Sequence, residues 1–194
     1  MTNPYISNIK TIAVVTVRRP GPQPASEDER CLIRSLMKEL HAGRYVAIPL
    51  YGKNGEEQDS VVVLNISLET TISCCRRHSQ TSFIFLTNNE GILEGGYWEV
   101  QDLSKPHARK SNPYVKKDAF SSVAAIDDAD NCSISVRGIR ITIPFSILSQ
   151  IDHNLGRLIK FNRISDKDGI IEYTINKVGQ SPYIWRKAIY NGIL

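Results

Sequence analysis

The stretch from Cys132 to Val178 constrains the possible fold more than any other part of the chain. Apolar and polar residues alternate from Cys132 to Val136, which is the period of a strand with one buried face. After Gly138 the phase of this alternation is reversed. A tight hairpin turn or a β-bulge produces such a reversal. The residues around Gly138 are therefore predicted to join two short strands.

The second half of this stretch has the signals of a short helix followed by a longer hairpin. Pro144 ends the preceding strand, and apolar residues then recur at helical spacing from Ile147 to Ile151. Strands are predicted at 158–164 and 170–177, and the Asp168-Gly169 pair between them is a strong hairpin turn signal.

Further strands and one clear helix are predicted outside this stretch. The strands are expected at 9–18, 44–51, 60–67, 81–87 and 91–101. The helix is expected at 27–42, where Ser26 and Glu29 make a capping box and apolar residues recur at helical spacing. Gly43 is its expected C-cap. Residues 70–80 are ambiguous between a short helix and a loop.

Two segments are expected to be irregular. The Gly95-Gly96 pair lies inside a predicted strand and indicates a bulge or a bend. Residues 102–118 hold two prolines, five Lys or Arg residues and few apolar ones. They are predicted to form an exposed basic loop.

Length and composition are those of one globular domain. The chain has 194 residues, of which 41% are hydrophobic, so residues 1–194 can bury a core as a single domain. The predicted fold class is α+β and β-rich. The expected architecture is a barrel or strongly curved antiparallel sheet of about seven to ten strands, with one main helix plugging an open end.

The composition also limits the class of function. A net charge of +4 permits contact with nucleic acid but does not require it. The four cysteines lack paired metal-binding spacing, so they are expected to be reduced thiols in a cytoplasmic protein, without a metal or other cofactor. The first residues lack a basic-then-apolar leader, and no apolar run approaches the length of a membrane span, so no membrane association is expected.

Recognisable catalytic motifs are absent from the sequence. It contains no G-x-S-x-G, no P-loop, no G-x-G-x-x-G and no H-E-x-x-H. The four histidines are scattered in polar settings: His41, His78, His107 and His153. One of them could act as a general base opposite Glu94, Glu99 or Tyr97. A small hydrolase or RNase-like enzyme with a His/Glu/Arg site on the sheet therefore stays open as an alternative.

Basic residues gather at two places in the sequence. They are expected to hold phosphates and comprise Arg76, Arg77, Arg109, Lys110, Lys116 and Lys117. Tyr97, Trp98 or Trp185 could stack on a base. Basic side chains interleaved with aromatic ones favour nucleic acid as the ligand.

The region 136–178 resembles the swapped-hairpin motif of AbrB/MazE-type DNA-binding domains and of related barrel-type DNA-binding domains. The matching positions are Arg140, Ile141, Thr142, Ile143, Pro144, Ile147, Ile151, Gly156, Ile159 and Phe161. Phe145 and Arg157 depart from the pattern, which usually has a small or basic residue and an Asp there. The resemblance implies that Arg137 and Arg140 face DNA, where they could read base edges.

The favoured function is therefore a nucleic-acid-binding module, with DNA as the preferred ligand, that uses basic loops on a β-barrel scaffold. The second alternative, beside the enzyme, is a structural or protein-interaction module. Such a module would oligomerise through strand edges or through the apolar C-terminal tail, residues 181–194.

Overall fold

A computed structural model gives the fold of the chain. It describes residues 8–16, 27–54, 56–101, 113–126, 131–136, 139–144, 147, 160–167, 170–176, 181, 183–188 and 190–191.

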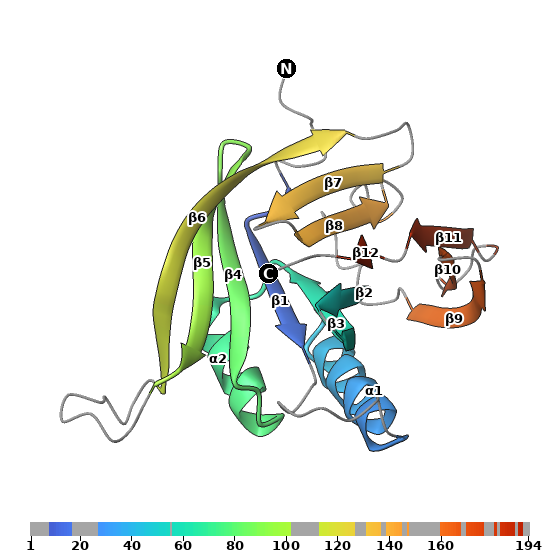
Figure 1. Cartoon of the computed structure of the whole chain (residues 1–194), viewed down its shortest axis with the longest axis horizontal. Helices are drawn as coiled ribbons and strands as arrows, with labels where there is room; N and C mark the ends of the chain where they lie inside the picture. The colour runs from blue at the N-terminus through green and yellow to red at the C-terminus, as the bar shows by residue number, and fades with distance from the viewer. Residues whose placement is uncertain are drawn as a thin grey trace.

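A twisted antiparallel sheet forms the centre of the molecule (Figure 1). In spatial order its six strands are β2 (Val46–Asn54), β3 (Glu56–Leu64), β1 (Thr11–Thr16), β4 (Ser82–Asn89), β5 (Ile92–Val100) and β6 (Tyr114–Ile126). The β2–β3 and β4–β5 pairs are hairpins, and β1 lies between them with its partners β3 and β4 on either side. β-branched and aromatic residues are frequent in β1, in Val61–Val63 of β3 and in the first part of β4, as expected for strands covered on both faces.

The sheet continues beyond both edges of this central part. The end of the long, bent β6 pairs with β7 (Asn131–Val136), which pairs in turn with β8 (Ile139–Pro144) (Figure 1). At the opposite edge, β12 (Tyr190–Asn191) pairs in parallel with β2. Among the described strands, β8 and β12 end the sheet, which is therefore open. The barrel that the sequence suggested is not formed by these strands.

A second, three-stranded antiparallel sheet follows in the sequence. Its order is β11 (Tyr183–Ala188), β10 (Ile170–Asn176) and β9 (Lys160–Lys167). The β9–β10 pair is the predicted long hairpin. The apolar tail contributes β11, the edge strand of this sheet, which pairs with β10.

Two helices pack on one face of the central sheet, α1 (Glu27–Ala42) and α2 (Leu68–Arg77). The Ser67 hydroxyl accepts a hydrogen bond from the Thr70 backbone and so caps the start of α2. The buried residues between the helices and the sheet are Ala13, Val15, Leu36, Leu40, Ala47, Val61, Val63, Ile66, Cys74, Cys75, Phe83, Phe85 and Tyr114.

The opposite face of the sheet is covered by strands. Ile141 and Ile143 of β8, together with Ile147, bury their side chains against this face. Tyr173 and Ile175 of β10 join the same core. The molecule therefore has three layers, in which the central sheet is buried on both faces.

Most predicted strands and the helix at 27–42 are confirmed, although this helix packs on a face of the sheet and does not plug an open end. Residues 148–151 of the predicted short helix lie outside the described part. Four further differences are found. The sheet is open, and α2 covers most of the ambiguous residues 70–80 and ends at Arg77. Strand β6 begins at Tyr114, within the segment 102–118 that was predicted as a loop, while residues 102–112 lie outside the described part. After α1 the positive φ of 65° belongs to Arg44 and not to Gly43.

The Gly95-Gly96 pair marks two close approaches of the backbone. A Cβ atom on Gly95 would lie 2.0 Å from the carbonyl oxygen of Phe85, and one on Gly96 would lie 2.1 Å from that of Asp118. The predicted irregularity itself lies next to the pair, where the β5–β6 register shifts between Tyr97 and Trp98.

Candidate functional site

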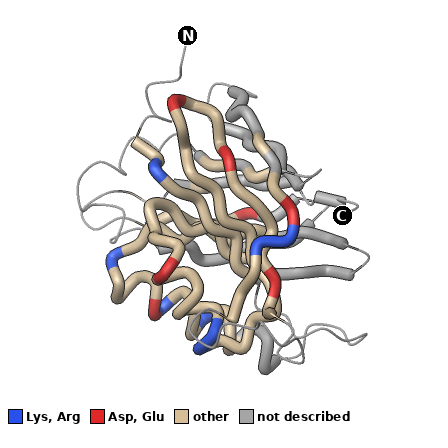
Figure 2. The backbone as a smooth tube through the Cα atoms, turned by 90° about the vertical axis from the view of Figure 1, so that its left-hand side faces the viewer, with Lys and Arg blue, Asp and Glu red and all other residues tan. Residues whose placement is uncertain are grey.

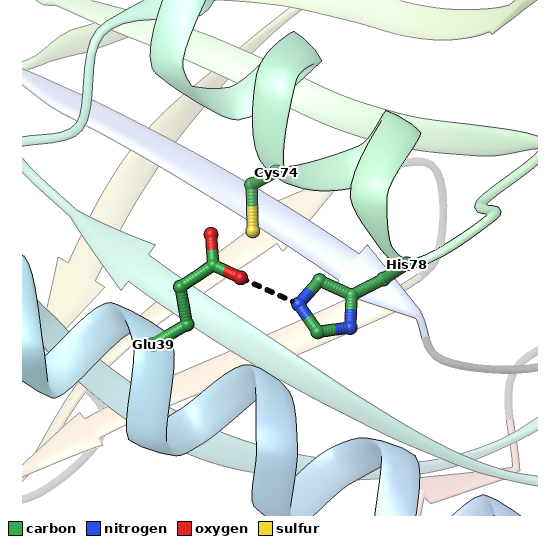
Figure 3. Close-up of side chains that lie close together, drawn as sticks. All are labelled: Glu39, Cys74 and His78. Carbon is green, nitrogen blue, oxygen red and sulfur yellow. Dashed lines mark hydrogen bonds and ion pairs between the residues drawn. The ribbon is translucent and has the colours of Figure 1, made fainter.

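Three chemically reactive side chains meet between the two helices (Figure 3). Glu39 comes from the last turn of α1, while Cys74 lies in α2 and His78 is the C-cap of α2. Cys74 and His78 are four residues apart, so the helical backbone brings them to one side of α2. One atom from each side chain, a carboxylate oxygen, a sulfur and an imidazole nitrogen, lies within 4.8 Å of the others.

The Glu39 carboxylate is the centre of this group. Its Oε2 accepts a hydrogen bond from Nε2 of His78 at 2.8 Å, because an ionised carboxylate can only accept. Its Oε1 accepts from Nε of Arg77 at 3.0 Å and also from the terminal Nη2 of the same guanidinium. Nη1 of Arg77 donates to Ser73 at 2.7 Å. The two carboxylate oxygens thus have different partners.

Exposure increases outward across the group. Cys74 is buried, and the side chain of His78 is 8% exposed, compared with 33% for Glu39 and 53% for Arg77. The Arg77–Glu39 ion pair is therefore at the surface and is expected to contribute at most about 1 kcal/mol to stability.

The neighbours shift the ionisation of Glu39 and Cys74 in opposite directions. The hydrogen bond from Arg77 is the main reason why the pKa of Glu39 is lowered, although partial burial acts against it. Burial, followed by the negative charge of Glu39, raises the pKa of Cys74 to about 12. The thiol is consequently neutral near pH 7, so the trio does not hold a thiolate nucleophile of the kind used in cysteine hydrolases.

A second feature lies on the same face of the sheet and is formed by residues of β4, β5 and β6. The rings of Phe83 and Trp98 are stacked with centroids 5.9 Å apart, and the Tyr114 ring meets Phe83 edge-on at 5.2 Å. Lys116 pairs across the strands with Trp98, and its side chain passes over Gly96. Trp98 remains partly exposed.

Arg76 belongs to this same surface. The positive charge of Arg76 is close enough to Tyr114 to favour the ionised form of its phenol, although burial dominates and raises the pKa of Tyr114 overall. Arg76, Lys116 and Lys117 are all exposed. Trp98, Arg76, Lys116 and Lys117 are called the α2–β6 surface below.

The eight predicted nucleic-acid-binding residues have different positions. Arg76, Lys116 and Lys117 are exposed, with Lys116 opposite Trp98 in the strand register and Lys117 next to it in β6, whereas the charge of Arg77 is paired with Glu39. Arg140 is in β8, opposite Ser135. Arg109, Lys110 and Arg137 lie outside the described residues. Figure 2 shows basic and acidic positions interleaved along the described chain.

The structure also brings a histidine, a glutamate and an arginine together, as the enzyme alternative requires. They are His78, Glu39 and Arg77, and they lie between two helices and not on the sheet. Sequence reasoning missed Glu39 and Cys74 as site residues. The available signal was the spacing of Cys74 and His78, which is helical once residues 68–77 are known to be a helix.

The Tyr114 hydroxyl gives a testable pH dependence. It donates to the Gln80 carbonyl at 2.6 Å, and burial raises its pKa above the ordinary value of 10.0. Above about pH 10 the unfolded chain loses this proton while the native state keeps it, so stability falls as pH rises through that region. The wild type is expected to lose stability at alkaline pH partly for this reason.

The variant Tyr114→Phe separates the contribution of the Tyr114 hydroxyl from that of other groups that titrate at alkaline pH. Near pH 7 it should be less stable by about 1 kcal/mol, because the hydrogen bond is lost. Above about pH 10 the difference from wild type should shrink. Urea unfolding on both sides of pH 10 measures it, and a constant difference at every pH would contradict the expectation. The alkaline slope left in the variant reports the buried thiols of Cys74 and Cys75, whose pKa values are also raised by burial.

None of the described helices combines the length and the apolar character needed to span a bilayer. Comparisons of the chain with protein-family models, with curated proteins and with solved structures find no match.

Proposed function

We propose that this chain binds nucleic acid, and that the α2–β6 surface contacts the ligand. The observation that carries the proposal is the position of Trp98, a partly exposed indole held by stacking on Phe83 and facing Lys116 on the neighbouring strand. An aromatic ring fixed beside cationic side chains is the arrangement on which proteins stack bases and hold the adjoining phosphates.

The expected electrostatic contribution is modest. Three exposed cations, Arg76, Lys116 and Lys117, are available on this surface, while Arg77 is engaged by Glu39. Three phosphate contacts correspond to a slope of about −2 in log affinity against log salt for a single strand. Binding should therefore weaken with salt, but less steeply than for a strongly basic domain.

DNA is the preferred ligand in this proposal. The resemblance of residues 136–178 to AbrB/MazE-type domains supports it, with Arg137 and Arg140 as candidate base-reading residues. Arg109 and Lys110 are proposed as further phosphate contacts. Of these four, Arg140 has a described backbone, in the β7–β8 hairpin.

Fluorescence anisotropy with labelled single-stranded DNA, duplex DNA and RNA at two salt concentrations tests the proposal. Trp98→Ala should weaken binding about 5- to 150-fold, the range that corresponds to the loss of one stacked base. Trp98→Phe keeps a ring and should recover most of the affinity. Joint reversal of Lys116 and Lys117 to Glu should weaken binding to every ligand and lower the salt slope.

The matched control is Arg34→Glu, which reverses one charge on an exposed position of α1 and is compared with the single reversals Lys116→Glu and Lys117→Glu. It should leave affinity within about twofold of wild type, because salt screens a charge that lies away from the bound ligand. Equal losses in Arg34→Glu and in either lysine reversal would show a nonspecific charge effect. Wild-type affinity that Trp98→Ala leaves unchanged would refute the α2–β6 surface as the binding site.

A further inference from the structure

We propose that Glu39, Cys74 and His78 form a binding site for one Zn²⁺ ion, which links α1 to α2. This inference is independent of nucleic-acid binding, because none of the three residues belongs to the α2–β6 surface. It rests on where the donor atoms converge and on their chemistry (Figure 3).

The donor atoms are already close to the spacing of a zinc site. Zinc bonds of about 2.0–2.3 Å in tetrahedral geometry place neighbouring ligand atoms roughly 3.3–3.8 Å apart. The donor atoms here lie within 4.8 Å of one another, and Nε2 of His78 is 2.8 Å from Oε2 of Glu39. Side-chain shifts on the order of 1 Å would let the ion replace that hydrogen bond.

The donor set selects the kind of metal. One sulfur, one imidazole nitrogen and one carboxylate oxygen suit Zn²⁺, whereas Mg²⁺ and Ca²⁺ prefer oxygen ligands alone. Three protein ligands leave a fourth tetrahedral position. Since Glu39 is one-third exposed, water can reach that position from the solvent side.

The surroundings orient the ligands as outer partners do in metal sites. Arg77 holds Oε1 of Glu39, which leaves Oε2 directed toward His78. The backbone N–H of His78 donates to the Cys74 carbonyl at 3.1 Å, and the Gln80 side chain donates to the His78 carbonyl at 3.0 Å. These bonds fix the end of α2 and therefore the position of the imidazole.

An ion-pair network without a metal would explain only part of this arrangement. Such a network requires Glu39, Arg77 and His78, but it has no need of a buried thiol beside the same carboxylate. A metal ion makes use of all three donors, because it binds thiolate, neutral imidazole and carboxylate together. The proton of the Cys74 thiol is released to solvent as the metal–sulfur bond forms. The presence of Cys74 therefore distinguishes the two arrangements.

Cobalt(II) substitution on the full chain tests the site. Chelator-treated protein is titrated with Co²⁺, and one equivalent should produce thiolate-to-cobalt charge-transfer absorption that one equivalent of Zn²⁺ removes. Cys74→Ser should abolish this band. Cys31→Ser removes an exposed cysteine outside the group and should keep it. Glu39→Gln and His78→Gln should each weaken binding by about 10-fold or more, at least the loss expected for an outer partner.

Two outcomes would overturn the proposal. One is wild-type protein that gives no thiolate–cobalt band, and the other is a band that survives in Cys74→Ser or is lost in Cys31→Ser. Circular dichroism checks that each variant is folded. If Cys74→Ser does not fold, the Glu39 and His78 variants decide, since unchanged affinity in both would equally exclude the site.

Discussion

Gly95→Ala is expected to lower the free energy of unfolding by about 3 kcal/mol or more. The added Cβ would lie 2.0 Å from the Phe85 carbonyl oxygen and 2.8 Å from the Leu86 Cα. Both obstructing atoms belong to the backbone of β4, the strand with which Gly95 pairs. No side-chain rotation can relieve the overlap, so strands β4 and β5 would have to separate in the middle of the sheet.

Equilibrium unfolding in urea, followed by circular dichroism, measures this loss. Gly43→Ala is the matched control, because its Cβ would meet ring atoms of the Tyr45 side chain at 3.0 Å, which can turn away. The control should cost less than about 1 kcal/mol, since a helix-end glycine gains helix propensity on becoming alanine. Similar losses in the two variants would contradict the role assigned to backbone contact at Gly95.

Phe83→Ala is expected to cost about 3–5 kcal/mol, the range for deleting a buried phenylalanine ring. Phe83 is 2% exposed in the core beneath the helices, and its ring contacts those of both Trp98 and Tyr114. Its removal would leave a cavity and release Trp98 from its stack. Under conditions in which the variant is still folded, affinity for nucleic acid should therefore also fall.

Phe83→Leu separates the two consequences. Leucine fills most of the cavity, so stability should fall by less than in the alanine variant, but it provides no ring for Trp98 to stack on. Unfolding curves give the stability difference, and a red shift of tryptophan emission reports the released indole. An alanine variant as stable as the leucine variant would show that the ring is not part of the core.

The hairpins were predictable from the sequence because their signals are local. The β7–β8 register runs from Asn131 opposite Pro144 to Val136 opposite Ile139, so the two strands pair on either side of the position where the alternation reverses. The β9–β10 hairpin likewise spans the predicted Asp168-Gly169 pair. In each case the alternating strand pattern and the turn residues are adjacent in the sequence, so both signals can be recognised without the structure.

Helix α2 was not predictable to the same degree, because its sequence is poor in strong helix formers. Threonine, isoleucine and cysteine make up much of Leu68–Arg77. Its helical conformation depends on the Ser67 cap and on burial of Thr71, Cys74 and Cys75 against the sheet. Tertiary packing thus decides between helix and loop where propensity does not.

The Glu39, Cys74 and His78 group depends on tertiary structure in the same way. Glu39 is 39 residues from His78 in the sequence, and only the packing of both helices on one face brings the two side chains together. Four scattered histidines gave no means of selecting one. The stacking of Phe83 on Trp98 could not be predicted either. The two residues are neighbours only in the observed β4–β5 register, and sequence alone determines such a register weakly.

The parallel pairing of β12 with β2 has a consequence for how the chain acquires its structure. Tyr190 and Asn191 meet Gly52 and Lys53, strand residues made almost 140 positions earlier during synthesis. The hydrogen-bonding groups at that end of β2 can therefore pair with β12 only after the late part of the chain has been synthesised. Contacts between residues so far apart in the sequence slow folding. During this interval the exposed edge of β2 can pair with another incompletely folded chain. Early folding is therefore the stage at which aggregation depends most on protein concentration.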